Sequence, residues 1–419
     1  MNKQKLHIQA KRWMITLSLS FIICHLSFSS ARAQTFYICE GNNTRTASQL
    51  DFTDGSVTTR DIDSITLHVP AMRFVGGDIS LLPTYEEHGA KYYDAQGKAI
   101  TNVLDFLRQQ GWNAMRIRLF VDPSKASAAD KGQGVRQDLD YVIALGRRIK
   151  EAGLLLMLDF HYSDSWADPA KQWTPDSWLA FGDEQLYSKI YDYTRECLLR
   201  MNAGGASPDF IQTGNEISYG MLWGKEGSTA NRCYSNSEAN WPRFAQLLKQ
   251  AGKACREICP RARIIIHTER VAQSAVLKNF YQQMKKQGVD YDIIGLSYYP
   301  YYHGTLSTLS SSLTMLEQTF PEKPIMVVET GCSYHYKVGD SDTGYPLTNA
   351  GQKKFTDDLI NTLRQHKSVS GLFWWFPEAN EYGLNWSTQR VTDNWYNAGL
   401  FDNETGKAQD ALYELINFK

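Results

Sequence analysis

From residue 72 onward, short apolar runs alternate with longer segments in which apolar residues recur every three or four positions. The short runs have the length of buried strands, and the longer segments have the period of amphipathic helices. This alternation is typical of a parallel sheet whose strands are joined by helices. The predicted strands are 74–78, 113–120, 154–160, 210–215, 264–267, 292–299, 324–331 and 371–376. The predicted helices are 103–110, 139–152, 186–201, 241–258, 277–287, 306–320, 355–365 and 408–416.

Eight strands of this kind favour an α/β fold closed into a (β/α)8 TIM barrel over an open doubly wound sheet. Such a barrel uses about 250 residues, and more with insertions, so residues 71–419 fit one decorated domain. Residues 34–70 contain two short predicted strands, at 35–39 and 65–69, and are too few for a core of their own. We expect a short β-rich N-terminal extension that packs on the barrel or acts as a spacer.

The amino terminus has the features of an export signal. Cationic residues precede an apolar run at 13–28, and Ala31-Arg32-Ala33 supplies an A-x-A cleavage site. The run is too short for an integral membrane span. A lipoprotein would need a small residue before Cys24, where the chain has Ile23. We therefore predict a signal peptide at 1–33 and a mature protein in the periplasm, at the cell surface or outside the cell.

Two of the predicted strands end in a glutamate. One runs out into Gly214-Asn215-Glu216, and the other ends at Glu329. Because active sites of parallel barrels lie at the carboxyl ends of the strands, both side chains should face the same opening. Two such carboxyls are what a retaining glycoside hydrolase needs, one as acid/base and one as nucleophile. Either glutamate alone would be explained more simply as a cap or an ion-pair partner.

The segments around the strand ends are rich in polar and aromatic side chains. Residues 159–169 are dense in Asp, His, Tyr and Trp, and residues 298–304 hold four tyrosines. Aromatic rings with polar neighbours suit sugars, which offer C–H faces for stacking and hydroxyls for hydrogen bonds. Of Trp374 and Trp375, we expect one to face the site and the other to face the helices. Packing of these rings on the barrel rim is the alternative.

The strand at 113–120 carries two arginines, Arg116 and Arg118. A guanidinium inside a barrel is costly unless it is paired, so at least one of them should meet a carboxylate at the barrel mouth. Asn215, directly before Glu216, could hydrogen-bond a sugar 2-hydroxyl in the transition state.

The overall charge argues against other classes of partner. Lys and Arg number 44 against 45 Asp and Glu, which is not the basic surface expected of a nucleic-acid-binding protein. No G-x-G-x-x-G or G-x-x-x-x-G-K-[ST] segment opens a helix, so nucleotide binding has no support. We expect a monomer that acts on a polysaccharide.

Six segments carry motifs of a known family. They are 76–80, 115–123, 159–169, 212–217, 296–300 and 328–330. In this order they resemble the motifs of the arabinogalactan endo-β-1,4-galactanases, glycoside hydrolase family 53. The resemblance implies a (β/α)8 barrel of the retaining clan that cleaves internal β-1,4-galactosyl bonds of type I arabinogalactan, the pectic galactan. It implies Glu216 as acid/base and Glu329 as nucleophile, and no organic cofactor.

The same resemblance implies a set of substrate-binding residues and a possible metal. Bacterial members often tie two of the strand-end loops with calcium, and Asp340 and Asp342 have the spacing of oxygen ligands. The alternative is that these aspartates belong to a solvent-exposed acidic loop that binds no metal. The resemblance places Asp164, Ser165, Trp166 and Ala167 in the substrate cleft, with His161, Arg118, Tyr298 or Tyr299, and Trp374 supporting the site. With Asn215 added from its place before Glu216, these are the predicted substrate-binding residues.

Two rival functions remain open at this point. Another hydrolase of the retaining clan, such as a β-mannanase or a β-1,4-glucanase, would keep the same two glutamates and differ in the loops of its cleft. A catalytically inactive glycan-binding protein would not require either glutamate. Measuring reducing-sugar release from galactan, mannan and cellulose distinguishes a galactanase from the other hydrolases. A Glu216→Gln variant distinguishes an enzyme from a binding protein, because only the enzyme should lose its function.

Overall fold

The structure is a computed structural model that describes residues 49–53, 56–60, 72–337, 342–385 and 387–419. The chain divides into two units, Met1–Ala71 and Met72–Lys419. In the first unit, β1 (Gln49–Thr53) pairs antiparallel with β2 (Ser56–Arg60). The strands expected at 35–39 and 65–69, and the signal peptide, lie outside the described residues. The predicted boundaries at residues 33 and 70 stay predictions.

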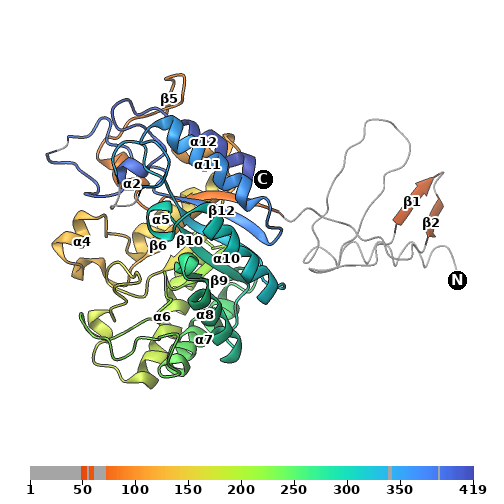
Figure 1. Cartoon of the computed structure of the whole chain (residues 1–419), viewed down its shortest axis with the longest axis vertical. Coiled ribbons are helices and arrows are strands. Elements are labelled where there is room, and N and C mark those ends of the chain that lie inside the picture. The colour runs from red at the N-terminus through yellow and green to blue at the C-terminus, as the bar shows by residue number, and fades with distance from the viewer. Residues whose placement is uncertain (1–48, 54–55, 61–71, 338–341, 386) are drawn as a thin grey trace. The chain divides into compact units, whose positions relative to one another are not determined.

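The second unit is a closed parallel barrel with the strand order β10-β11-β12-β3-β6-β7-β8-β9. Figure 1 shows its strands surrounded by helices. This confirms the (β/α)8 barrel, and all eight predicted strands are present. They are β3 (Phe74–Asp78), β6 (Ala114–Leu119), β7 (Leu155–Phe160), β8 (Phe210–Thr213), β9 (Arg263–Thr268), β10 (Ile293–Tyr298), β11 (Ile325–Thr330) and β12 (Val369–Trp375).

The helices that follow the strands have buried apolar faces against the sheet and polar outer faces. The longer ones are α3 (Val103–Gln109), α5 (Leu139–Glu151), α6 (Asp183–Ala203), α7 (Trp241–Ile258), α8 (Ser274–Lys286), α10 (Leu306–Thr319) and α11 (Asn349–Leu363). The shorter ones are α2 (Leu82–Glu87), α4 (Ala128–Gly132), α9 (Pro300–His303) and α12 (Asp410–Glu414). A small hairpin, β4 (Tyr92–Tyr93) with β5 (Ala99–Ile100), precedes α3.

Some helices begin earlier than the apolar pattern predicts. The helix expected from residue 355 begins at Asn349, because the Thr348 side chain accepts a hydrogen bond from the Gly351 N–H and caps it. The helix expected from residue 186 begins at Asp183, after Gly182. Their first turns are polar, so hydrophobic periodicity does not mark them.

The barrel interior is filled rather than hollow. One apolar cluster draws side chains from every barrel strand, as expected for the packed layers of such a barrel. Its buried members are Phe74, Ala114, Met157, Phe210, Ile265, Ile293, Met326, Val328 and Phe373. The polar residues described below lie further along the same strands, so the apolar cluster forms the floor beneath the site.

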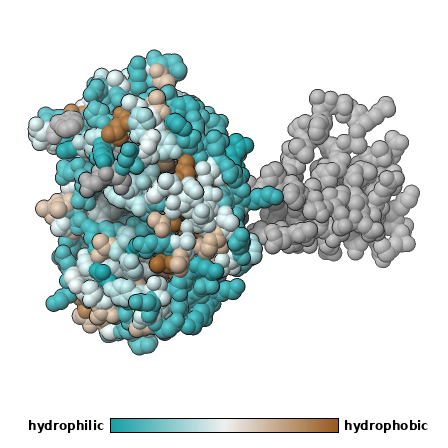
Figure 2. All heavy atoms as spheres, viewed as in Figure 1, coloured by the Kyte–Doolittle hydropathy of each residue, from teal (hydrophilic) through white to brown (hydrophobic). Residues whose placement is uncertain are grey.

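Few large hydrophobic side chains of the described barrel residues are exposed. On the face drawn in Figure 2, hydrophobic residues are scattered among hydrophilic ones. Among the described residues, no helix has both the length and the apolar character needed to span a membrane. The five cysteines of the described barrel residues are unpaired and buried, and free cysteine is among the residue types most often found buried.

One close approach in the barrel wall predicts a stability effect. A Cβ on Gly76 would lie 2.1 Å from the Ala114 carbonyl oxygen and 2.9 Å from the Phe373 ring. Because backbone cannot yield as a flexible side chain does, Gly76→Ala should lower the free energy of unfolding by about 1–3 kcal/mol. Gly182→Ala is the control, because no atom lies within 4 Å of its added Cβ. Denaturant unfolding of both variants measures this, and equal losses would contradict it.

Candidate active site

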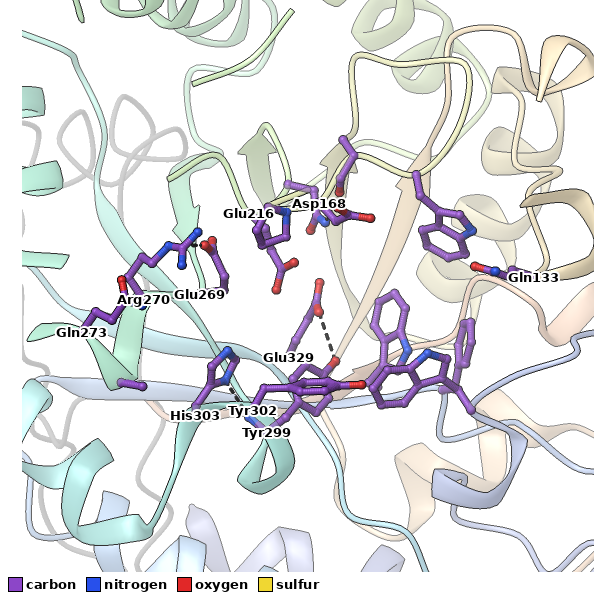
Figure 3. Close-up of a pocket in the computed structure, with 18 residues that line it drawn as sticks. Gln133, Asp168, Glu216, Glu269, Arg270, Gln273, Tyr299, Tyr302, His303 and Glu329 are labelled. Carbon is purple, nitrogen blue, oxygen red and sulfur yellow. Dashed lines mark hydrogen bonds and ion pairs between the residues drawn. The ribbon is translucent and has the colours of Figure 1, made fainter. Parts of the chain in front are cut away.

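The carboxyl ends of the barrel strands surround a pocket of about 460 Å³. Glu216 and Glu329 both line it, together with Trp166, Trp375 and Tyr299. Figure 3 shows the two carboxyl groups pointing toward each other across the pocket. Strands that are far apart in the sequence therefore bring the two strand-end glutamates to one place.

Glu216 follows β8 on a sharply turned backbone. Its φ is 48°, in the left-handed region that non-glycine residues rarely adopt, and Gly214 before it has a φ of 113°. Neighbouring groups hold this conformation: Gln172 Nε2 donates to the Asn215 carbonyl oxygen at 2.7 Å. The Glu216 N–H donates to His267 Nδ1 at 3.3 Å. Unusual backbone held by its surroundings is typical of functional sites, and here it directs the side chain into the pocket.

Glu329 lies within β11 and is almost fully buried. Its Oε1 is 2.9 Å from Arg116 Nη2 in an ion pair, and its Oε2 accepts a hydrogen bond from the Tyr299 hydroxyl at 3.0 Å. Both contacts favour the ionised carboxylate. Glu216 has no arginine or lysine contact of this kind among the described residues.

Ser297, at the end of β10, lies between the two glutamates. Its Oγ is 2.6 Å from Glu216 Oε1 and 3.4 Å from Glu329 Oε2. The two oxygens can therefore be at most about 6 Å apart, the sum of those distances. Retaining enzymes hold their carboxyls about 5–5.5 Å apart, whereas inverting enzymes need roughly 6.5–9.5 Å for a water. The spacing favours direct attack by a carboxylate.

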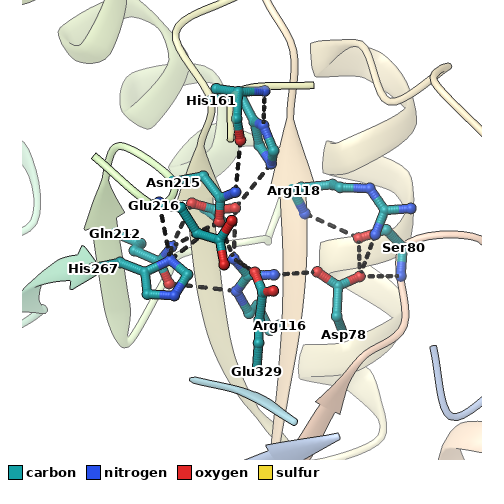
Figure 4. Close-up of polar contacts among 12 residues, drawn as sticks. Asp78, Ser80, Arg116, Arg118, His161, Gln212, Asn215, Glu216, His267 and Glu329 are labelled. Atoms are coloured by element: carbon teal, nitrogen blue, oxygen red, sulfur yellow. Dashed lines mark hydrogen bonds and ion pairs between the residues drawn. The ribbon is translucent and has the colours of Figure 1, made fainter. Parts of the chain in front are cut away.

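Buried arginines balance the carboxylates beneath the pocket (Figure 4). Arg116 is 2.7 Å from Asp78 and 2.8 Å from Asp159, besides its contact with Glu329. Arg118 is 2.6 Å from the other oxygen of Asp78. The prediction that one of these arginines meets a carboxylate is confirmed for both. Such pairing is what makes a guanidinium tolerable inside a barrel.

A chain of hydrogen bonds ends on the Glu216 carboxyl. Gln212 Nε2 lies 2.8 Å from His267 Nδ1, and because an amide N–H can only donate, that ring nitrogen accepts. His267 Nε2 then carries the proton and donates to Ser297 Oγ at 2.8 Å. Ser297 in turn donates to Glu216 Oε1. Burial and the Arg116 charge lower the pKa of His267 well below its usual value, which keeps the ring neutral as this direction requires.

The electrostatic surroundings separate the two glutamates. Burial, followed by the charges of Glu329 and Glu269, raises the pKa of Glu216 well above its usual range. Burial also raises the pKa of Glu329, to about 7, but the Arg116 charge opposes this shift. Arg116 therefore favours the anion of Glu329, whereas no arginine or lysine ion pair holds Glu216 among the described residues. An environment that treats two carboxyls differently is what separate acid/base and nucleophile roles would need.

The loop after β7 supplies both pocket residues and supporting residues. Trp166 and Ala167 of this loop line the pocket, as does Asn215 after β8, in agreement with the prediction for all three. His161 lies behind it, with Nδ1 accepting from the Ala167 N–H and Nε2 3.1 Å from Asp159. The Arg118 guanidinium lies under the Trp166 ring, 4.7 Å from its centroid. These two residues therefore support the pocket wall from below.

Two other predicted residues of this loop do not reach the pocket lining. Asp164 accepts hydrogen bonds from the Asp122 and Asp176 N–H groups and so ties three loop segments together. Ser165 is partly buried beside it and is also outside the lining. For Asp164, the structure indicates a role in holding the loop.

Two of the predicted substrate-binding residues, Tyr298 and Trp374, are wrong because side chains alternate along a strand. Tyr298 is turned away from the pocket, where its hydroxyl donates to the Gly304 carbonyl oxygen and its ring stacks on Phe355 of α11. Trp374 also packs on Phe355 and donates from Nε1 to the Ala398 carbonyl oxygen. Successive residues of a strand face opposite sides, so Trp375 takes the pocket side in place of Trp374. Tyr299, which is among the predicted substrate-binding residues, does line the pocket.

The calcium prediction falls partly outside the described residues, because Asp340 is one of those not described. Asp342 is exposed, and its Oδ1 accepts a hydrogen bond from the Gly344 N–H. Among the described residues, no three His, Cys, Asp or Glu side chains come together as a metal site. No step of the chemistry is assigned to calcium, and its presence at this loop stays a prediction.

The sequence patterns used above do not identify several residues of the site. Asp78 and Asp159 end β3 and β7 in the same way that Glu329 ends its strand, which was a usable signal. The strand expected at 264–267 continues to Thr268 and is followed by Glu269, a third strand-end glutamate. The remaining missed residues are Gln212, His267 and Ser297, whose types alone give no such signal.

Two strand-end carboxyls that face each other across a pocket, one of them paired with an arginine, are the arrangement that a glycoside hydrolase uses. Comparison with known proteins gives the family. Residues 74–415 match the family model described as Glycosyl hydrolase family 53, and the chain belongs to that family.

Individual proteins similar to this chain agree with the family assignment. The probable arabinogalactan endo-beta-1,4-galactanase A of Neosartorya fischeri is 33% identical over 323 residues, covering 73% of this chain and 84% of the relative. The endo-beta-1,4-galactanase of Bacillus subtilis is 28% identical, covering 78% and 81%. The solved Ignisphaera aggregans GH53 catalytic domain is 32% identical with a TM-score of 0.72, covering 84% of this chain and 98% of that structure.

The hydrogen bond from Ser297 yields a pH prediction. It favours the ionised form of Glu216, so Ser297→Ala should raise the pKa of Glu216 further. Because the acid must be protonated to act, the alkaline limb of the kcat/KM profile should move to higher pH. Loss of the contact should also lower kcat by about ten-fold.

Ser370→Ala is the matched control, because it removes a buried hydroxyl that bonds the Ile325 carbonyl oxygen at the other end of the strands. Its profile should equal that of the wild type. An alkaline limb that stays in place or moves to lower pH in Ser297→Ala would contradict the assignment.

Proposed function

We propose that this protein is an exported endo-β-1,4-galactanase that hydrolyses internal β-1,4-galactosidic bonds of type I arabinogalactan with retention of configuration. The substrate is supported by the names of its family 53 relatives, which are galactanases in both bacteria and fungi. The mechanism is carried by one observation: Ser297 contacts both glutamates, so they are close enough for one to attack the sugar that the other helps to release.

In the first step, Glu216 gives its proton to the glycosidic oxygen while the Glu329 carboxylate attacks the anomeric carbon. The bond from that carbon to the oxygen breaks, the shortened chain leaves as an alcohol, and a glycosyl ester forms on Glu329. In the second step, the ionised Glu216 takes a proton from water, and the water oxygen attacks the same carbon. The ester bond breaks, so both carboxyls return to their starting states.

The surrounding residues support this sequence of events. Arg116 and the Tyr299 hydroxyl hold Glu329 ionised and fix its direction. The Arg116 Nη2 also donates to Asn215 Oδ1 at 2.8 Å, which orients the Asn215 amide beside the sugar 2-hydroxyl. Trp375 supplies an aromatic wall for the sugar ring. Because two glutamates carry both the proton transfer and the attack, the reaction needs no organic cofactor.

Export is part of the proposal on the basis of sequence alone. The cationic residues, apolar run and Ala31-Arg32-Ala33 of the amino terminus support a cleaved signal at 1–33. Pectic galactan is a polymer outside the cell, so an exported hydrolase meets its substrate there.

The substrate and the two roles are tested together by hydrolysis of linear β-1,4-galactan with products sized over time. The wild type should release mixed oligosaccharides from the start, as an endo-acting enzyme does. Glu329→Gln and Glu216→Gln should lose at least about 10³-fold in kcat. Glu238→Gln, which neutralises an exposed acid paired with Lys286, should match the wild type. Release from mannan or cellulose but not from galactan would overturn the substrate assignment.

The stereochemical course follows from the spacing of the glutamates. Proton NMR of early galactan digests should show the β-anomer of the new reducing end first, with the α-anomer growing in only by mutarotation. Initial formation of the α-anomer would mean an inverting reaction and would overturn the role of Glu329 as nucleophile.

A further inference from the structure

A third carboxyl in the pocket neither transfers the proton nor attacks the sugar in the two-glutamate reaction. Glu269 follows β9, is 6% exposed, and lines the pocket beside Glu216. Its Oε1 accepts from the Ser218 hydroxyl and lies 2.7 Å from Arg270 Nε. Its Oε2 is buried and has no hydrogen-bond partner among the described residues. A buried carboxyl oxygen without a protein partner is costly, so Oε2 is available to accept from a hydroxyl that enters the pocket.

The position of Glu269 separates it from the aromatic wall of the pocket. In the barrel order, β9 lies beside β8, which leads into Glu216, whereas β12, which carries Trp375, lies on the other side of β11 and β10. Figure 3 shows Glu269, Arg270 and Gln273 to one side of the catalytic pair and Gln133 to the other. The pocket therefore has a charged end and an aromatic end, with the reacting bond between them.

The reaction mechanism determines whether the attacked sugar or the leaving sugar lies at the charged end of the pocket. Glu216 must reach the oxygen of the leaving group, so the leaving sugar lies on the side of Glu216. The sugar that is attacked must lie over Glu329, and Trp375, on the neighbouring strand β12, lines the same pocket. Since Glu269 neighbours Glu216 on the next strand, it faces the sugar that leaves.

We propose that Glu269, held in place by Ser218 and Arg270, binds hydroxyl groups of the sugar on the leaving-group side of the cleaved bond. This rests on the proposed galactanase function and assigns the pocket's charged end to recognition of the departing chain. Sugar hydroxyls supply the donors that Oε2 lacks. A carboxylate that bonds them fixes the orientation of the leaving sugar and places the glycosidic oxygen next to Glu216.

Two observations support this reading of the cluster. Burial raises the pKa of Glu269 to about 7, as expected of a carboxyl whose second oxygen still lacks a donor. Arg270 is itself fixed, with Nε 3.0 Å from the Ser218 hydroxyl and its guanidinium 4.2 Å from the centre of the Tyr219 ring. The carboxyl is thus held by a rigid cradle that leaves one oxygen free.

The test compares two substrates that differ only on the leaving-group side. One is linear galactan, and the other is 4-nitrophenyl β-1,4-galactobioside, in which nitrophenol replaces the leaving sugar. Glu269→Gln should lose about 10- to 100-fold in kcat/KM on galactan and less than about three-fold on the nitrophenyl substrate. Glu238→Gln, at an exposed position, is the charge-matched control and should change neither value.

A merely structural role for Glu269 would lower both activities together, and no role would lower neither; either result overturns the proposal. Glu269→Asp keeps the charge but withdraws the oxygens, and it should show the same selective loss on galactan. If the wild type releases nothing from galactan, the proposed function itself fails, which is a different outcome from a wild type that cleaves galactan but shows no selective loss in the variants.

Discussion

The site depends on how the barrel accommodates buried charge. Arg116 and Arg118 are fully buried, and Arg116 is held at once by Asp78, Asp159 and Glu329. Two guanidinium groups thus face three carboxylates, while the neighbouring histidines have lowered pKa values. The charges of Glu329 and Glu269 add to burial in raising the pKa of Glu216, which favours its protonated form. The same arginine that favours the anion of Glu329 thus favours, through that negative charge, a proton on Glu216.

Much of this could be predicted from the sequence because the signals are local. Eight apolar runs define the strands, and a parallel barrel collects whatever follows them at one end. That logic places Glu216 and Glu329 in one pocket without any knowledge of the loops. Applied to every strand end, it would also have found Asp78, Asp159 and Glu269, since each ends or follows a buried strand in the same way.

The rest depends on three-dimensional details that a single sequence does not carry. Side chains alternate between the two faces of a strand, so the register of β10 decides whether Tyr298 or Tyr299 faces the pocket. That register shifts between Leu296 and Ser297, where β10 pairs with β11. The contacts of Asp164 with two distant N–H groups require the loop path, not its composition. The serine that joins both glutamates has a residue type too common to attract notice, and only its position gives it a role.

The measurement that tests this account most directly is covalent trapping of the nucleophile. An activated 2-deoxy-2-fluoro galactobioside slows both steps, so the glycosyl ester should accumulate and be found by mass spectrometry of peptides. The account predicts one added disaccharide, on the peptide that contains Glu329, and no labelling in Glu329→Gln. A label on Glu216 or Glu269 would contradict the central claim that the carboxylate paired with Arg116 is the one that attacks.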